Sequence, residues 1–235
     1  MQDFLHGCGA FLMFILPAAA IMLTARALIR IPDELFRKIL HFILLGAYIP
    51  LVFAFRVWWH AAGLAAAFAL VIYPILVLAS RLPGFAKFTT QRRDGEFVSS
   101  MVIALFTMSL SVTVCWGLFG DRYLVLACIY AWGVGDAFAA LIGKRFGKHK
   151  IRFSFADRRK SVEGSAAMFA TSAIAVWIVL MLRGGMGIFA CALTALAAAA
   201  VSAFVELCTK NGYDTITCPA AAMAVILPLI KFLGG

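Results

Sequence analysis

Charged residues are scarce in this chain of 235 residues, and acidic ones are the scarcest. Lys, Arg, Asp and Glu together make up 14% of the residues, and only 11 of them are acids. A soluble domain contains roughly 25% charged residues. Residues of the AVILMFWYC set reach 64%. This composition excludes a soluble globular domain, a disordered tail and a nucleic-acid-binding module, so no nucleic-acid partner is expected.

The chain also has no C-x-x-C pair, and its first residues are not expected to form a cleaved leader. None of the six cysteines forms a C-x-x-C pair and most lie within apolar runs, which predicts free thiols with neither a disulfide framework nor a zinc site. The first three residues, Met1-Gln2-Asp3, lack a basic region, so the first apolar run is predicted to be a retained helix. The chain shows no internal repeat and no low-complexity linker.

Long apolar runs account for most of the chain. Each is long enough for a bilayer, which takes about 20 residues. They predict an all-α, polytopic integral membrane protein with seven or eight transmembrane helices in one domain, 1–235. The predicted helices are 4–25, 39–56, 57–80, 97–119, 122–143, 162–182, 186–207 and 215–233. Pro219 and Pro228 leave a kink or a re-entrant segment open in the last one.

The basic residues fall mainly on one side of these helices. Seventeen of the 21 Lys and Arg residues lie at the ends of the first, third, fifth and seventh helices, and four lie on the other side. The positive-inside rule therefore places these odd-numbered loops in the cytoplasm and both termini opposite. The most basic of them is loop 144–161. A surface for anionic lipid head groups or nucleotide phosphate is a second interpretation of the same charges.

Four acids lie within or beside the apolar runs: Asp136, Glu163, Glu206 and Asp214. Asp136 lies about 10 Å below the predicted helix end at Gly143, at ~1.5 Å rise per residue. An ionised acid at the centre of a span costs about 2.5–3.5 kcal/mol, so such a residue usually faces a cavity and has a partner. Simpler interpretations are a buried ion pair for Asp136, a helix cap for Glu163 and a turn for Asp214.

All four acids fall at one membrane depth, beside the basic loop 144–161. Carboxylate oxygens suit Mg²⁺, which also bridges phosphates, and Lys and Arg neutralise the remaining phosphate charge. The residues therefore predict a site for a Mg²⁺–nucleotide complex. On the same side, Arg37 and His41 share a helix face at i and i+4, next to Lys38. A functional role and a structural role are both open for His41.

Several of these residues belong to elements that resemble the family of dolichol kinases, phytol kinases and CTP-dependent diacylglycerol kinases, here called the polyprenol kinase family. Residues 37–41 resemble its R-K-x-x-H element, and residues 135–150 resemble G-D-x-x-A-x-x-x-G-K/R-K/R-F/Y-G-K-x-K. Residues 160–165 resemble K-S-L/I/V-E-G-S, and residues 214–219 resemble D-N-x-x-I/V-P. This resemblance extends over most of the chain. In the last element, Thr and Cys stand where the family often has Asn and Ile or Val.

The resemblance implies a membrane enzyme that moves the terminal phosphate of a nucleotide, often CTP, to a lipid alcohol. On this hypothesis Asp136, Glu206 and Asp214 hold Mg²⁺, and Asp136 or His41 accepts the hydroxyl proton. Glu163 completes the metal shell or orients Lys160. The residues expected to bind the nucleotide are Arg37, Lys38, Lys144, Arg145, Lys148, Lys160 and Ser161.

Two other activities stay open. A phosphatidate cytidylyltransferase making CDP-diacylglycerol would use the same loop and acids but release pyrophosphate. A transporter or channel would use Asp136 as an ion or proton site and would bind no nucleotide. Also open are the acceptor (polyprenol, dolichol, phytol or diacylglycerol) and CTP against ATP as donor. A prokaryotic plasma membrane is expected, and Gly184-Gly185 with an Ala-rich seventh helix permits packing within the chain or in a homodimer.

Overall fold

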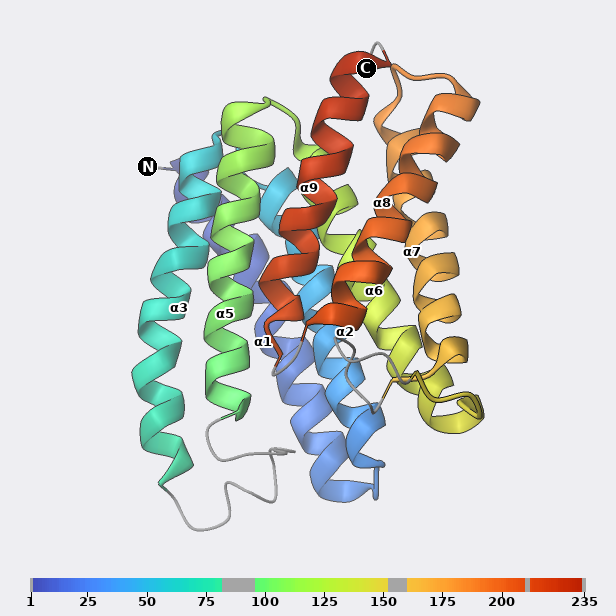
Figure 1. The fold of residues 1–235 in the computed structure, drawn as a ribbon. Coiled ribbons are helices and arrows are strands. Elements are labelled where there is room, and N and C mark those ends of the chain that lie inside the picture. The colour runs from blue at the N-terminus through green and yellow to red at the C-terminus, as the bar shows by residue number, and fades with distance from the viewer. Residues whose placement is uncertain (1, 82–95, 152–159, 210–211, 234–235) are drawn as a thin grey trace. The chain divides into compact units, whose positions relative to one another are not determined.

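The computed structural model describes residues 2–81, 96–151, 160–209 and 212–233. Within this part, eight helices are long and apolar enough to cross a membrane, which confirms the prediction of an all-α, polytopic membrane protein. Figure 1 shows the helices in order along the chain. Their bounds are α1 (Gln2–Leu28), α2 (Asp33–Phe53), α3 (Trp58–Ser80), α5 (Glu96–Ser111) with the π-helical η1 (Val112–Leu118), α6 (Arg122–Phe146), α7 (Val162–Arg183), α8 (Ile188–Cys208) and α9 (Asp214–Phe232).

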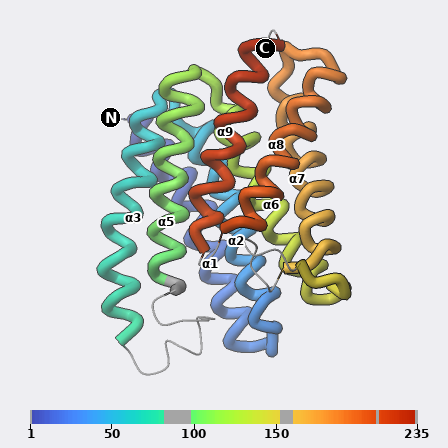
Figure 2. Tube along the Cα trace, viewed as in Figure 1, coloured from blue at the N-terminus to red at the C-terminus, as the bar shows by residue number. Residues whose placement is uncertain are grey.

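The chain forms two compact units, Met1–Thr113 and Val114–Gly235. In the first unit α1 packs against α2, and α3 packs against α5 (Figure 2). A Cβ atom at Gly7 would lie 2.5 Å from the ring of Phe55, so glycine lets α1 approach this buried ring closely. Many large apolar side chains of the unit are exposed, as expected of helices that face lipid.

The start of α2 corrects the sequence analysis. The helix begins at Asp33, six residues before the predicted start, and its first turn contains Asp33 and Glu34. Acids in a first turn interact favourably with the positive end of the helix dipole. Arg37 and Lys38 are therefore helical residues, and His41 lies about two turns into α2.

In the second unit α6 packs against α7, α8 and α9, α7 against α8, and α8 against α9 (Figure 1). Glycines let α6 and α7 approach most closely. A Cβ atom at Gly135 would lie 2.2 Å from the hydroxyl of Ser172, and one at Gly164 would lie 3.0 Å from the carbonyl of Ala139. Small residues at such positions are the usual means of close helix packing in membranes.

Three further features of the helices differ from the prediction. Helix α6 continues to Phe146, so the first three residues of the basic loop 144–161 are helical. Helix α9 is continuous through Pro219 and Pro228, so it is not a re-entrant segment. The chain after α5 widens into the π-helical η1, which the sequence analysis did not predict. All six cysteines are free, as predicted.

Candidate functional site

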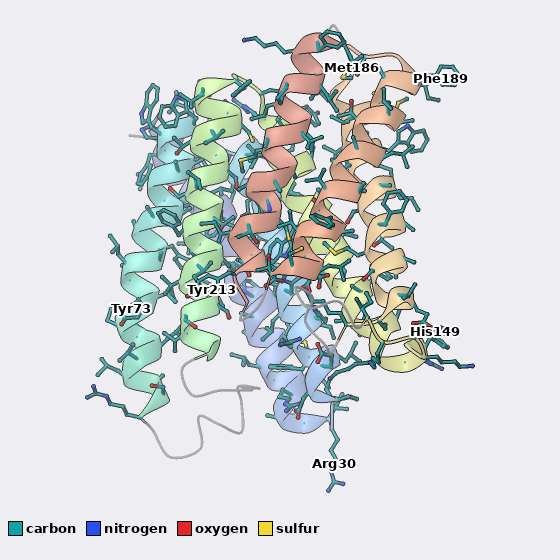
Figure 3. All side chains as sticks on the ribbon, viewed as in Figure 1. Arg30, Tyr73, His149, Met186, Phe189 and Tyr213 are labelled. Carbon is teal, nitrogen blue, oxygen red and sulfur yellow. The ribbon has the colours of Figure 1, made fainter. Side chains whose placement is uncertain are left out.

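One end of the second unit gathers most of the predicted site residues. The chain leaves α6 and enters α7 at this end, and it leaves α8 and enters α9 there as well. Figure 3 shows His149, from the α6–α7 connection, at this end of the unit, and Met186, from the α7–α8 connection, and Phe189, in the first turn of α8, at the opposite end. The order of the helices thus brings Asp136, Glu163, Glu206 and Asp214 toward this end of the unit, whereas their common membrane depth stays a prediction.

Three carboxylates from three helices form what we call the acidic cluster: Asp136 on α6, Glu206 on α8 and Asp214 on α9. The carboxylate of Glu206 is within electrostatic reach of the other two. Asp136 lies ten residues before the end of α6, a distance of about 15 Å. The longer helix places it farther from the helix end than the predicted 10 Å. Like charges this close raise one another's energy, which favours the binding of a cation.

Buried side chains from four helices close the inner side of the acidic cluster. Trp132, Met168, Ala203 and Cys218 pack together, one each from α6, α7, α8 and α9. Trp132 lies one turn before Asp136, and its indole Nε1 donates a hydrogen bond to Oδ2 of Asp214, at 3.4 Å. This contact ties α6 to the start of α9 and orients one carboxylate of the cluster.

Lys160 joins the start of α7 to the end of α8. Its Nζ lies 2.9 Å from Oε1 of Glu206, and both side chains are largely buried. The same ammonium donates hydrogen bonds to the backbone carbonyl of Glu206 and, at 3.3 Å, to that of Thr209. A cation at a helix C-terminus is favoured by the helix dipole. Lys160 thus both neutralises Glu206 and caps α8.

The hydrogen bonds of the Glu163 carboxylate go to the start of the basic loop rather than to Lys160. Its carboxylate accepts hydrogen bonds from the backbone N–H groups of Lys148 and His149, both at 3.2 Å, and contacts Nδ1 of His149 at 2.7 Å. Beyond this point the two ends of the loop pair with each other. The backbone N–H of Ile151 donates to the carbonyl of Lys160, at 3.1 Å. Lys148 and Lys160, far apart along the loop, are thereby held at one site.

Ser161 caps α7. Its Oγ accepts a hydrogen bond from the N–H of Gly164, at 3.2 Å, and the residue is buried. A Cβ atom at Gly147 would lie 2.6 Å from this Oγ, so glycine at 147 gives the serine its space. The sequence analysis expected Ser161 to bind nucleotide, and the structure engages its hydroxyl in a helix cap of the usual kind.

The other basic residues that the structure describes at the end of α6 and just after it are exposed. Lys144 and Arg145 form the last turn of α6, where cations interact favourably with the helix dipole, and Lys148 follows the helix. Seven of the residues counted in the charge distribution lie outside the described part of the chain: Lys87, Arg92, Arg93, Arg152, Arg158, Arg159 and Lys210.

Arg37, Lys38 and His41 belong to the first unit. Arg37 forms a hydrogen-bonded ion pair with Glu34, three residues earlier on α2. Lys38 is buried, and the His41 ring meets that of Phe42 edge-on, with centroids 6.4 Å apart. The roles expected for these three residues in nucleotide binding and proton transfer stay predictions.

The carboxylates of the acidic cluster suit a metal ion that binds together with the substrate phosphates. Within the described ranges, no group of three or more His, Cys, Asp and Glu side chains is arranged to hold a metal ion by itself. Mg²⁺ is usually held by one or two carboxylates together with substrate phosphates and water. The acidic cluster beside exposed lysines fits that second mode, in which phosphate oxygens complete the shell.

Sequence reasoning missed two contacts of this site. Trp132 donates to Asp214 from another helix, and the only sequence signal is its position one turn before Asp136. His149 pairs with Glu163, and its place in a basic loop gave no indication of an acidic partner. Both contacts join residues far apart in the chain, so no local pattern could predict them.

Comparisons with known proteins identify the family of the chain. No family model and no solved structure matches the chain. A phytol kinase from Synechocystis sp. is 30% identical over 219 residues, which cover 88% of this chain and 85% of the relative. An identity of this size over most of both sequences confirms the resemblance seen in the motifs. The chain belongs to the polyprenol kinase family.

Proposed function

We propose that the protein is a lipid alcohol kinase that transfers the γ-phosphate of a nucleoside triphosphate, CTP, to the hydroxyl of a membrane alcohol. The observation that carries this proposal is the convergence of the acidic cluster with Lys160 and the basic loop at one end of the second unit. The relationship to a phytol kinase supports the reaction class and makes a prenyl alcohol such as phytol the first acceptor to test.

In the proposed reaction the alcohol oxygen attacks the γ-phosphorus, the bond from this phosphorus to the bridging oxygen breaks, and CDP leaves. Catalysis of phosphoryl transfer consists mostly of positioning and charge stabilisation. Mg²⁺, when bound, supplies positive charge at the phosphates. Asp136, Glu206 and Asp214 would hold it, and Asp136 or His41 would accept the hydroxyl proton.

The basic residues of the second unit bind the triphosphate. Lys144, Arg145 and Lys148 are exposed and reach it from the end of α6 and the following turn, and Lys160 reaches it from the start of α7. Glu163 acts indirectly by fixing the backbone that carries Lys148. Ser161 acts through its cap, which sets the position of Lys160. Arg37 and Lys38 are proposed to add phosphate contacts from α2.

The location of the reaction follows from the charge distribution. We propose that the acidic cluster faces the cytoplasm and that the termini lie opposite, because nucleotides are cytoplasmic and the positive-inside rule places the basic connections there. The acceptor's apolar chain lies among the membrane helices with its hydroxyl at the cluster. On this proposal the whole chain, 1–235, acts as one transmembrane domain.

The test is a transfer assay with protein purified in detergent. CTP or ATP labelled at the γ-phosphate is supplied with Mg²⁺ and, in separate reactions, phytol, a polyprenol, diacylglycerol or phosphatidate. We expect label on an alcohol with CTP, and loss of transfer in Asp136→Asn. Asp33→Asn, an exposed acid paired with Arg26 on the first unit, is the matched control and should retain transfer.

Two outcomes would reject the proposal. Pyrophosphate release with phosphatidate, with no label on any lipid, would indicate a cytidylyltransferase. The absence of both transfer and nucleotide binding would favour a transporter in which Asp136 serves as an ion site. Full transfer by a folded Asp136→Asn protein would remove this residue from the metal site while leaving the reaction class in place.

A further inference from the structure

Lys160 uses all of its hydrogen-bond donors within the protein. Its ammonium contacts Oε1 of Glu206 at 2.9 Å and donates to the backbone carbonyls of Glu206 and Thr209. A lysine ammonium carries three N–H groups and accepts no hydrogen bond. In this arrangement Lys160 therefore has no donor left for a phosphate oxygen, although its position beside the basic loop suits phosphate binding.

Glu206 is also engaged. It is 7% exposed, and its Oε1 contacts the ammonium of Lys160. Removing the ammonium without a replacement would leave a buried carboxylate beside Asp136 and Asp214, and an uncompensated buried charge is strongly destabilising. The ion pair thus keeps the acidic cluster stable in the absence of ligand, while its ammonium repels a metal ion at this carboxylate and is held away from a phosphate.

We propose that Lys160 and Glu206 exchange partners when the Mg²⁺–nucleotide complex binds: Glu206 passes to the metal, and Lys160 passes to a phosphate. This inference rests on the proposed function. The exchange keeps both charges neutralised, because each buried group gains a new partner as it loses the old one. Mg²⁺ alone would leave Lys160 without an anion, and a free phosphate would leave Glu206 without a cation. The site therefore selects the complex over either component.

The first test measures binding of a metal alone. Mn²⁺, a paramagnetic substitute for Mg²⁺, is titrated into the purified full chain without nucleotide, and free Mn²⁺ is followed by electron paramagnetic resonance. Lys160→Met removes the competing ammonium but keeps the length of the side chain. We expect it to bind Mn²⁺ about tenfold more tightly than the unaltered protein, the effect of one charged hydrogen bond.

The matched control is Lys231→Met, which removes the same charge near the other end of α9. Lys231 is exposed and lies about 25 Å along the helix from Asp214, well beyond a screening length. Its Mn²⁺ affinity should equal that of the unaltered protein. A Lys160→Met protein that binds Mn²⁺ no more tightly than the Lys231→Met protein would overturn the proposal.

The second test needs no substitution. The unaltered protein is treated with an amine-acylating reagent, and the labelling rate of each lysine is read by mass spectrometry. We expect Mg²⁺ alone to raise the rate at Lys160, because the metal releases it from Glu206. Mg²⁺ with a CTP analogue that cannot transfer phosphate should lower the rate again, and Lys231 should be unaffected. A rate at Lys160 that does not respond to saturating Mg²⁺ would contradict the exchange.

These measurements separate the inference from the proposed function. Stronger metal binding by Lys160→Met, with no label transferred to any alcohol, would support the exchange and reject the lipid kinase. Transfer to an alcohol with unchanged metal binding and unchanged Lys160 labelling would support the kinase and reject the exchange.

Discussion

Two ion pairs of the second unit, one at each end, differ in their surroundings. At one end Lys160 pairs with Glu206, in the presence of Asp136 and Asp214. At the other end Arg183, at the end of α7, donates from Nε to Asp121, before α6. All four paired side chains are largely buried. Burial and pairing alone therefore do not distinguish a binding site from a structural contact.

The difference lies in the charges around each pair. Asp121 also caps α6 by accepting a hydrogen bond from the N–H of Tyr123, at 2.8 Å, and Arg183 donates to the carbonyl of Gly184, at 3.2 Å. Each charge there has its partner and a backbone contact. At the acidic cluster Glu206 is paired with Lys160 and is also within electrostatic reach of Asp136 and Asp214, and carboxylate oxygens are the ligands that a divalent cation binds.

The largest expected effect follows from removing one carboxylate of the cluster without changing its shape. Glu206→Gln should lower kcat of phosphoryl transfer by at least about 100-fold, the scale of losing one preorganised electrostatic contact. Its melting temperature should stay the same or rise, because an amide oxygen still accepts from Lys160 and the repulsion by neighbouring acids is gone. Transfer assays and thermal unfolding in detergent check both parts. If Glu206→Gln keeps full kcat but lowers the melting temperature, the Lys160–Glu206 pair is structural, like the Arg183–Asp121 pair.

The matched change at the opposite end should give the reverse pattern. Asp121→Asn keeps an oxygen for the helix cap but removes the charge that binds Arg183. We expect a loss of about 2 kcal/mol in the free energy of unfolding, the scale of a charged hydrogen bond, and an unchanged kcat for the folded fraction. Unfolding by a denaturing detergent followed by circular dichroism measures the loss. A large fall in kcat at unchanged stability would show that the two ends are not functionally distinct.

A smaller effect is expected one step away from the acidic cluster. Glu163→Ala removes the acceptor that holds the N–H groups of Lys148 and His149, so the turn after α6 loses its fixed shape. We expect the KM for nucleotide to rise about tenfold, with kcat changed much less, since the lost contact positions a binding residue. His149→Ala removes one donor of this set and should raise KM less. Equal falls in kcat and kcat/KM for Glu163→Ala would instead place its carboxylate in contact with the reacting groups.

The sequence was sufficient to predict the fold and to name candidate residues for the site. Apolar runs of bilayer length predict the spans, because a membrane leaves the backbone few alternatives to helices. Asp136, Glu206 and Asp214 were named as candidates because a carboxylate within or beside such a run is costly unless it has a partner or a function. Both inferences depend on local composition, which a single sequence contains in full.

The pairing of these residues could not be predicted in the same way. One predicted role of Glu163 was to orient Lys160, three residues earlier. In the structure Lys160 instead forms its ion pair with Glu206, on another helix. The early start of α2 and the extension of α6 depend on helix-end energies of a few tenths of a kcal/mol to about 1 kcal/mol, which are small beside burial. Partners across helices depend on packing, and packing is a property of the folded chain.

Trp132 offers the smallest test of the comparison, because it contacts one carboxylate of the acidic cluster without being one of them. Its indole donates to Asp214 at 3.4 Å, near the long limit of a hydrogen bond, so its contribution is at the weak end of the usual range. Trp132→Phe keeps most of the buried ring but removes the donor. We expect the Mg²⁺ concentration for half-maximal transfer to rise about threefold, equal to about 0.7 kcal/mol, with kcat unchanged. Trp177→Phe, on the partly exposed face of α7, should shift neither quantity. If Trp132→Phe lowers the melting temperature but leaves the Mg²⁺ dependence unchanged, the indole serves packing alone, like the contacts around Arg183 at the other end.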